Sequence, residues 1–419
     1  METEDMFELC IIGDGMIGSG AAYHASKTLQ GNVVIIGPGE NKAEGDADIF
    51  GAWYDEGRIS AIIDRTEKYA VLSAKSAARY RAIENESGIS FFDNIGYLII
   101  CNAKDDSMGQ AYRRTAEKMK CGRNLTFDEA VEEFPNFKLH SDQTFLFDER
   151  GGRINPRKLR EAQLTVAERY GCKIIKDVAK KVRNISRNSK TEFEIETDSG
   201  LIIRSLKVLV CTGAFSYCRD ILPREIQPEL RPLTQTVLFW EVTEKQAAQL
   251  RGMPCVGCKY DKPGSKTWLS NTKEHFYLMP PIRYQNGKYY IKVGHAERGK
   301  DDMERLLRTP EELKNWYSSN GNQYAISFLE KTLREFFKDI KPVSTSTGVC
   351  LTTHTDDGRP IIDLIQPGFG IALGDNGCCA KSSNEIGRIA MLLVSTGQWD
   401  LEIPHELYQL DRNKILSHL

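Results

Sequence analysis

The sequence predicts an α/β fold, an α+β arrangement of two domains in which a parallel-sheet domain is interleaved with a mostly antiparallel one. Three observations lead to this prediction. A strand, a glycine turn and a helix open the 419-residue chain, and similar units recur near its middle and near its end. Between the last two units, short strands rich in aromatic residues follow one another over residues 233–293. Strands that alternate with helices favour a parallel sheet, whereas successive strands favour an antiparallel one.

The first unit carries a dinucleotide-binding signature. The apolar run from Phe7 to Ile12 predicts a buried parallel strand, and the glycines after it open a helix in the order G-x-G-x-x-G. In this motif the first glycine permits a tight turn, the second lets a pyrophosphate approach the backbone, and the third lets helix and strand pack closely. We therefore expect this Rossmann-like turn to bind the cofactor through Gly13, Gly15, Met16, Ile17 and Gly18.

The second strand of this unit departs from the usual pattern. An acidic residue at its end normally binds the ribose hydroxyls, but Gly37 stands at that position. Glu40 is the first carboxylate that follows, and whether it takes over this contact stays open.

The rest of the chain divides into helical and extended stretches. Periodic apolar positions predict helices over residues 64–84, 111–120, 127–133, 156–171 and, as a pair, 310–338. Apolar runs predict strands over residues 90–101, 178–185, 192–197 and 205–211, and around residue 174. No linker or repeat separates the domains. We predict a dinucleotide-binding domain formed by residues 1–92, 146–228 and 344–419, and a substrate domain formed by residues 93–145 and 229–343.

Composition argues against several classes of function. A formal net charge of -2 gives no electrostatic case for nucleic acid or for an anionic membrane surface. No apolar run is long enough to predict a membrane span, and the acidic N-terminus enters a strand without a secretory signal. Eleven cysteines are too sparse here for a disulfide scaffold, and the one C-x-x-C, Cys255 and Cys258, has no second pair. A reducing intracellular compartment fits this cysteine usage.

Segments far apart in the chain carry a resemblance to a known family. They are the glycine turn, "VLVCTGAFS" in the middle, and "GVCLTTHTDDGRPIID" followed by "ALGDNGCCAKSSNEIGRIAMLLVSTG" near the end. The set resembles the D-amino-acid oxidase-like FAD-dependent oxidoreductases and, within them, the monomeric sarcosine oxidase and L-pipecolate oxidase family. The resemblance covers nearly the whole chain. It implies FAD as the cofactor, lying between the two domains, with Gly213, Gly377 and Lys381 among the residues that bind it.

The resemblance also gives a role to Cys350. In this family the matching cysteine carries the flavin covalently, through a thioether to the ring methyl group. A packed free thiol is the alternative, because buried cysteines are common. Two departures alter the expected pocket wall: Thr352 replaces the usual tyrosine, and Cys378 and Cys379 replace the usual glycine and aromatic pattern.

Four cationic or titratable residues are implied in the chemistry. Arg58 and Lys381 stand where the family has cations that hold the substrate carboxylate. Lys292 and His295 flank a glycine at the end of a predicted strand. The resemblance places Lys292 near the reactive flavin nitrogen, where it would assist oxygen, and His295 over the substrate. The alternative for each is a solvated surface group, because charges are rarely buried unpaired.

These features predict an FAD-dependent oxidase of a secondary amine or of an N-methyl or cyclic amino acid. Oxygen would be the acceptor, and the products would be an imine and hydrogen peroxide. Three alternatives stay open: an oxidase of glycated (fructosyl) amino acids, an NAD-dependent dehydrogenase, and a flavin-bound protein without turnover. Gly37 and the segment around Cys350 weigh against the dehydrogenase.

The last three residues suggest a location. Ser417, His418 and Leu419 form a variant of the Ser-Lys-Leu address that the peroxisomal import receptor reads. We expect a peroxisomal protein with that receptor as a partner, and an arbitrary polar tail is the alternative.

Overall fold

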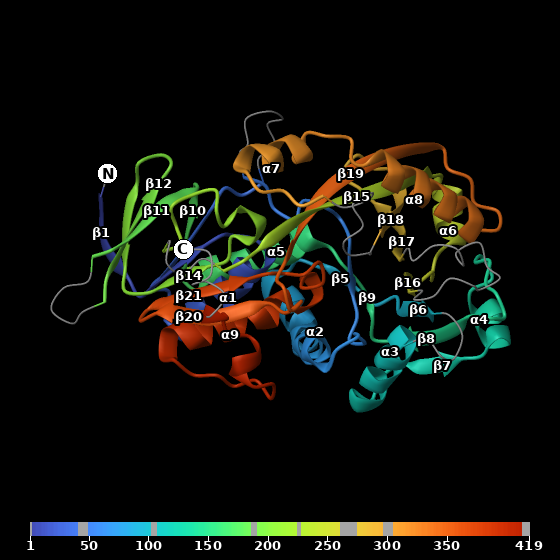
Figure 1. The fold of residues 1–419 in the computed structure, drawn as a ribbon, viewed down its shortest axis with the longest axis horizontal. Coiled ribbons are helices and arrows are strands. Elements are labelled where there is room, and N and C mark those ends of the chain that lie inside the picture. Colours follow the sequence, from blue (N-terminus) through green and yellow to red (C-terminus); the bar gives the residue numbers. More distant parts are fainter. Residues whose placement is uncertain are drawn as a thin grey trace.

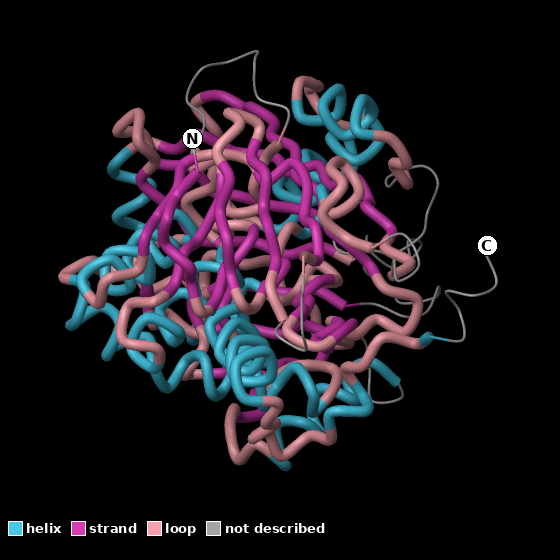
Figure 2. Tube along the Cα trace, turned by 90° about the vertical axis from the view of Figure 1, so that its left-hand side faces the viewer, coloured by secondary structure: helices cyan, strands magenta, loops and turns pink. Residues whose placement is uncertain are grey.

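The computed structural model describes residues 2–40, 49–101, 107–185, 191–223, 228–259, 275–295 and 305–412. Four sheets form its framework (Figure 1). Strands run through the middle of the molecule, and most helical segments lie toward its periphery (Figure 2). Within the described residues, no helix combines the length and the apolar character that crossing a membrane requires.

A six-stranded sheet follows the glycine turn. Its neighbouring strands are parallel except at one edge, where β20 runs against β21. The order across the sheet is β10 (Lys173–Lys176), β3 (Val33–Gly37), β2 (Leu9–Ile12), β14 (Val208–Val210), β21 (Phe369–Leu373) and β20 (Ile361–Gln366).

Both faces of this sheet are covered, so its central strands are apolar on both sides. Leu9 and Ile11 pack against helices on one face, and Cys10 and Ile12 pack toward a four-stranded sheet on the other. The helices are α1 (Met16–Thr28), α2 (Glu67–Ser87), α5 (Pro156–Arg169) and α9 (Ser383–Thr396). The four-stranded sheet has the order β1 (Glu2–Phe7), β13 (Ile202–Ser205), β12 (Phe193–Thr197) and β11 (Ala179–Asn184).

The second large sheet has eight strands, and Figure 1 shows it on the right of the molecule. Every neighbouring pair is antiparallel except β16 with β6. The order is β19 (Ser344–His354), β15 (Arg231–Val242), β18 (Tyr289–His295), β17 (Phe276–Arg283), β16 (Cys255–Lys259), β6 (Tyr97–Cys101), β8 (Thr144–Asp148) and β7 (Arg123–Leu125).

Smaller elements complete this half of the chain. Helix α8 (Gln323–Phe336) covers one face of the eight-stranded sheet, where its Leu329 and Leu333 pack with Trp240 of β15. The other helices are α3 (Ser107–Lys118), α4 (Phe127–Glu133), α6 (Glu244–Gln249) and α7 (Pro310–Tyr317). A three-stranded antiparallel sheet has the order β4 (Arg58–Ser60), β9 (Gly152–Ile154) and β5 (Phe92–Asp93).

Strand β15 pairs with two strands that follow it in the chain. Gln235 lies opposite Cys350 of β19, and Phe239 lies opposite Lys292 of β18. Side chains alternate along a strand, and residues directly opposite share a face. These four side chains therefore project from the same face of the sheet, whereas Trp240 points to the face under α8.

The predicted fold class is confirmed, because a mostly parallel and a mostly antiparallel sheet are interleaved along the chain. The single strand predicted from Phe7 to Ile12 is divided: β1 ends at Phe7 in the four-stranded sheet, and β2 begins at Leu9 in the six-stranded one. Strand β19 pairs in the eight-stranded sheet, although its residues fall in the stretch predicted for the dinucleotide-binding domain. The tail, residues 417–419, lies outside the described residues.

Candidate active site

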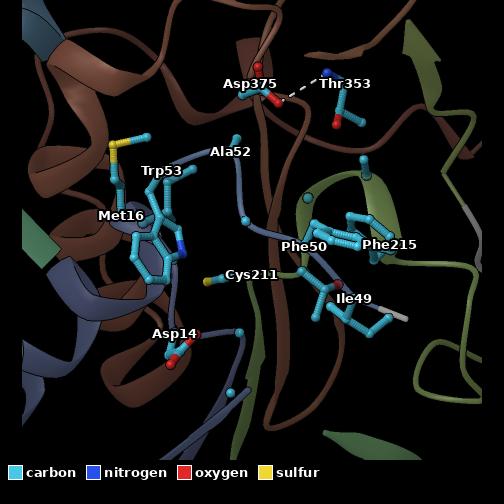
Figure 3. Close-up of a pocket in the computed structure, with 18 of the residues that line it drawn as sticks. Asp14, Met16, Ile49, Phe50, Ala52, Trp53, Cys211, Phe215, Thr353 and Asp375 are labelled. Carbon is cyan, nitrogen blue, oxygen red and sulfur yellow. Dashed lines mark hydrogen bonds between the residues drawn. The ribbon is translucent and has the colours of Figure 1, made fainter. Parts of the chain in front are cut away.

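Two adjoining cavities are built from the segments that the sequence singles out. The first, the glycine cavity, is lined by the glycine turn, the end of β3, residues 49–54, residues 211–215 and residues 372–380 (Figure 3). In the close-up, Asp14, Met16 and Trp53 lie along one side, and Phe50 and Phe215 lie along the other. The second, the lysine cavity, has a volume of about 630 Å³, and Lys292 and Lys381 both line it.

The glycine turn has the shape that a pyrophosphate requires. Gly13 has a φ of +102°, and a Cβ there would lie 2.5 Å from the carbonyl oxygen of Cys211. A Cβ on Gly18 would collide with the carbonyl oxygen of Gly13. Gly15 differs, because a Cβ there would meet only Trp53, at an ordinary 3.6 Å. Neighbouring protein atoms thus demand the first and third glycines, and the second faces the cavity, where the N-terminus of α1 favours a phosphate.

Asp14 takes the place where a side chain of residue 37 would be. A Cβ on Gly37 would collide with the Asp14 carboxyl group. That carboxyl accepts a hydrogen bond from the Gly39 N–H at 3.1 Å and forms an ion pair with Arg160. Glu40, the sequence candidate for the ribose contact, pairs with Arg157 at 2.8 Å. A carboxylate therefore does stand at the end of β3, and it comes from inside the glycine motif.

Cys350 lies where the two cavities meet, and its side chain lines both. Its sulfur is 3.7 Å from a terminal nitrogen of Arg58, and its carbonyl oxygen accepts a 2.9 Å hydrogen bond from Trp316 Nε1. The thiol is half-buried and takes part in no disulfide among the described cysteines. A ring that bridged the two cavities would pass this sulfur.

A buried cluster of charges surrounds Asp55 on the wall of the lysine cavity. Lys292 is 1% exposed, and its Nζ donates to the Asp55 carboxylate and, at 3.1 Å, to the carbonyl oxygen of Gly57. Arg58 donates to the same carboxylate oxygen, and Tyr284 donates to the other oxygen at 2.9 Å. The cluster joins the start of β4 and the residues before it to strand β18 and to the residue that follows β17.

Burial and charge act in opposite directions in this cluster. Burial alone would raise the pKa of the Asp55 carboxyl, but the charges of Lys292 and Arg58 outweigh it and hold that pKa below its usual range. Burial and the nearby Arg58 guanidinium lower the pKa of Lys292 to about 8, against the opposing pull of Asp55. Lys292 is therefore a cation that titrates close to neutral pH.

Lys381 forms a second buried ion pair. Its Nζ lies 2.6 Å from Asp64 Oδ2, and its carbonyl oxygen accepts a 2.7 Å hydrogen bond from Tyr80. Burial would lower the pKa of Lys381, but Asp64 more than offsets it and raises that pKa above its usual range. Lys381 stays protonated wherever the protein is folded near neutral pH.

His295 is buried at the end of β18 and lines the lysine cavity. The Thr236 N–H donates to its Nε2 at 3.2 Å, so the neutral ring carries its proton on Nδ1. Burial lowers the pKa of His295 to about 4, and the ring is neutral at physiological pH.

The structure brings the predicted site residues together around the two cavities. Those lining the glycine cavity are Gly13, Gly15, Met16, Ile17, Arg58, Gly213, Cys350 and Gly377, with Gly18 packed behind the turn. Those lining the lysine cavity are Arg58, Lys292, His295, Cys350, Gly377 and Lys381. Sequence reasoning missed the carboxylates Asp14, Asp55 and Asp64. Asp14 carried a signal in its place between two motif glycines, and Asp55 carried one in standing three residues before Arg58, whereas Asp64 pairs with Lys381 more than three hundred positions away.

The remaining cysteines divide into pocket and core residues. Cys378 lines the lysine cavity, and Cys379 lines the glycine cavity. Thr352 lines both cavities, and its Oγ1 lies 2.8 Å from His354 Nε2. Cys255 and Cys258 are both buried in strand β16 and belong to different core clusters, so they are packing residues rather than a redox pair.

Two curated proteins named as sarcosine oxidases resemble this chain over most of its length. The chain is 20% identical over 384 residues to the human "Peroxisomal sarcosine oxidase", with 88% of this chain and 87% of the relative covered. It is 23% identical over 421 residues to the "Probable sarcosine oxidase" of Arabidopsis thaliana, with 93% of this chain and 88% of the relative covered.

Solved structures share the fold at low sequence identity. NikD, an amino acid oxidase of nikkomycin biosynthesis, superposes with a TM-score of 0.72 and 17% identity, covering 97% of this chain and 98% of its own. The fructosyl peptide oxidase of E. terrenum gives a TM-score of 0.71 and 19% identity, with 96% and 91% covered. The L-proline dehydrogenase of P. horikoshii gives a TM-score of 0.69 and 19% identity, with 98% and 99% covered.

A family-wide comparison settles the class of protein. Residues 8–391 match the family described as DAO, FAD dependent oxidoreductase, which spans the glycine turn, both cavities and Cys350. A dehydrogenase that uses NAD, one of the alternatives left open by the glycine turn, does not fit this match. The chain belongs to the FAD-dependent oxidoreductases of the DAO family, and FAD is its cofactor.

Proposed function

We propose that this protein oxidises a secondary amine, or an N-methyl or cyclic amino acid, to an imine while oxygen is reduced to hydrogen peroxide. One observation carries the proposal. Cys350 stands between a cavity built on the glycine turn and a cavity whose wall holds two buried lysines. The sarcosine oxidases among its relatives support amine chemistry.

The chain's own part in the reaction is to hold the cofactor, to orient the substrate and to place charged groups beside both. When bound, FAD supplies the acceptor for the hydride and the route of electrons to oxygen. Gly13 to Gly18 would receive the pyrophosphate, and Cys350 would carry the ring through a thioether to its methyl group. That attachment removes two hydrogens, one from the thiol and one from the methyl group, and their two electrons would pass through the ring to oxygen. The predicted domain boundaries remain part of this proposal, with the ring lying between the two domains.

Two cations are placed to bind the carboxylate of the substrate. Lys381, kept protonated beside Asp64, and Arg58, beside Cys350, place positive charge on the wall of the lysine cavity. In a buried setting such charges act more strongly than in water. His295 is neutral and offers hydrogen bonding without repelling a protonated amine.

Lys292 serves the oxygen step. Oxygen gains negative charge as it accepts its first electron, and a fixed positive charge beside it lowers that barrier. Lys292 is buried, faces the cavity and belongs to the same sheet face as Cys350.

Absorption spectra and acid denaturation test the cofactor part of this proposal. The purified protein should show flavin bands, and after acid precipitation the colour should stay with the polypeptide. Cys350→Ser should still bind flavin but release it to the supernatant. Complete release from the parent protein would reject the thioether and leave Cys350 a packed thiol.

A peroxide-coupled screen tests the substrate class. N-methyl amino acids, cyclic amino acids and glycated amino acids should be compared at equal concentration. A glycated amino acid oxidase is the second candidate, because a cavity of about 630 Å³ is roomy for a small amine. Peroxide from glycated substrates alone would favour that candidate, and peroxide from none of the three groups would reject an amine oxidase.

We also propose a peroxisomal location through the import receptor. The tail Ser417-His418-Leu419 and the peroxisomal relative support it. Deleting the three residues should move a tagged protein to the cytosol, and unchanged punctate import after the deletion would refute the proposal.

A further inference from the structure

Two buried lysines on one cavity wall have different electrostatic partners. Lys292 shares Asp55 with Arg58, whereas Lys381 has Asp64 as its ion-pair partner. Asp55 and Asp64 are the two carboxylates among the described residues that line this cavity. Neither aspartate belongs to a sequence motif, and neither is a reacting group in the proposed function.

The Asp55 carboxylate is held on every side. One oxygen accepts from both Lys292 and Arg58, and the other accepts from Tyr284 at 2.9 Å and from the Glu56 N–H at 2.7 Å. A carboxylate with four donors is fixed in position and in its ionised form. It can therefore fix the groups that donate to it.

Lys292 depends on this carboxylate. Its side chain is almost fully buried, and a buried lysine without an anionic partner gives up its proton. Among the described residues, the groups that face Lys292 come from four elements and include one carboxylate: Asp55 and Arg58 at β4, Tyr277 on β17, Cys350 on β19, and Cys255 on β16. Arg58 lowers the pKa of Lys292 and so disfavours its ammonium form, whereas Asp55 raises that pKa and favours the ammonium form.

We propose that Asp55 is the positioning residue of the oxygen step: it holds the Lys292 ammonium at the cavity wall and keeps it charged. This inference rests on the proposed role of Lys292. Asp64 has the same chemistry, but its partner is Lys381, so it has no such effect on the oxygen step. Asp55 is thus shared by Lys292 and Arg58, whereas Asp64 pairs with Lys381.

Chemical labelling of the lysines tests this without substrate or flavin. Cyanate carbamylates a neutral amine and not an ammonium, so the pH of half-maximal labelling, read by peptide mass spectrometry, follows each lysine's protonation. In Asp55→Asn the Lys292 midpoint should fall, with labelling about tenfold faster at pH 7 than in the parent. In Asp64→Asn the Lys292 midpoint should stay and the Lys381 midpoint should fall. Asp55→Glu should restore the Lys292 midpoint toward the parent value.

Reoxidation of the flavin gives a second readout. The holoenzyme is reduced with dithionite, so no amine is needed, and mixed with oxygen at several pH values. The parent rate should fall as the pH rises through about 8, where Lys292 loses its proton. In Asp55→Asn the fall should begin at lower pH, leaving reoxidation about tenfold slower at pH 8 and close to the parent rate at pH 6. A purely structural loss would not recover at low pH.

Three results separate the inference from the proposed function. A Lys292 midpoint unchanged in Asp55→Asn, or moved equally by Asp64→Asn, overturns the inference. If Asp55→Asn does not fold, Arg58→Gln carries the test: removing the competing cation should raise the Lys292 midpoint, and an unchanged midpoint overturns the shared cluster. Reoxidation at the parent rate in Lys292→Met would instead overturn the proposed oxygen role and leave the labelling result standing.

Discussion

The two cavities meet at Cys350 but are built by different means. At the glycine turn the glycine cavity is shaped by backbone atoms, because the carbonyl oxygens of Cys211 and Gly13 exclude a Cβ at Gly13 and Gly18. The lysine cavity takes its character from charged side chains that reach it from distant parts of the chain, with Lys292 and Lys381 held by ion pairs. The glycine turn depends on steric exclusion by backbone atoms, and the lysine cavity depends on electrostatic pairing across the fold.

The two cavities are therefore disrupted by different kinds of substitution. A glycine turn fails when an atom is added, whatever the pH. A buried ion pair fails when a charge is removed, and its failure depends on pH because the partner can neutralise itself. Three predictions follow from this contrast, and each can be contradicted by one measurement.

Replacing Lys292 with methionine should have the largest effect. The substitution keeps the length of the side chain and removes its charge. A charge pair at about 4 Å and an effective dielectric near 20 is worth roughly 4 kcal/mol, so reoxidation by oxygen should slow by about 10² to 10³-fold. Anaerobic reduction of the flavin by the amine should persist, which stopped-flow absorbance can measure separately. Reoxidation at the parent rate would make Lys381 the next candidate for the oxygen site.

Two substitutions in the glycine turn should differ in their effects, one on the stability of the fold and the other on cofactor binding. In Gly18→Ala the new Cβ collides with the Gly13 carbonyl oxygen, so the free energy of unfolding should drop by roughly 3 kcal/mol even without FAD. In Gly15→Ala the new Cβ has room in the protein, so the apoprotein should melt near the parent temperature while FAD occupancy falls. Calorimetry of the apoproteins and the ratio of flavin to protein absorbance distinguish the two. Equal melting of both variants would contradict the steric account.

The buried, neutral His295 should make the stability of the fold depend on pH in the mildly acidic range. Its pKa is about 4 in the folded protein and about 6.5 in an unfolded chain, so between those values only the unfolded chain binds the proton. Stability should therefore fall as the pH drops from about 6.5 to 4, by roughly 2 kcal/mol at pH 5 from this group alone. His295→Gln keeps an acceptor for Thr236 and should melt with a smaller loss between pH 7 and pH 5. The pKa values of Asp55 and Asp64 are lowered, so their contribution is lost only below about pH 4. An unchanged loss in the variant would mean that other groups control this range.

Local patterns gave the fold class and the glycine cavity. The run "GDGMIG" specifies both the turn and the helix after it because every contact that demands a glycine lies nearby in sequence or in an adjoining strand. The helices over residues 127–133 and 156–169 also match their predicted ranges closely, since capping side chains mark their starts at Thr126 and Asn155.

The carboxylates of the lysine cavity were beyond reach from the sequence. Asp55 lies 237 residues from Lys292, and Asp64 lies 317 residues from Lys381. The pairing of Asp55 with Arg58 is local, but its pairing with Lys292, like that of Asp64 with Lys381, arises only when the fold has brought the lysine to the carboxylate. The break between β1 and β2 was missed for a similar reason: Phe7 and Leu9 are equally apolar, and only the choice of sheet separates them.

Strand β15 is a template that fixes the spacing between Cys350 and Lys292, because it pairs with the strands that carry both residues. Gln235 and Phe239 are four positions apart, and they stand opposite Cys350 and Lys292. At about 3.3 Å per residue, the template sets these two backbone positions roughly 13 Å apart along the strand. Inserting one residue between them would turn one of the two groups to the face under α8, whereas inserting two would keep the face and change only the spacing. The proposed attachment of the cofactor at Cys350 and the proposed oxygen role of Lys292 therefore depend on one and the same strand register.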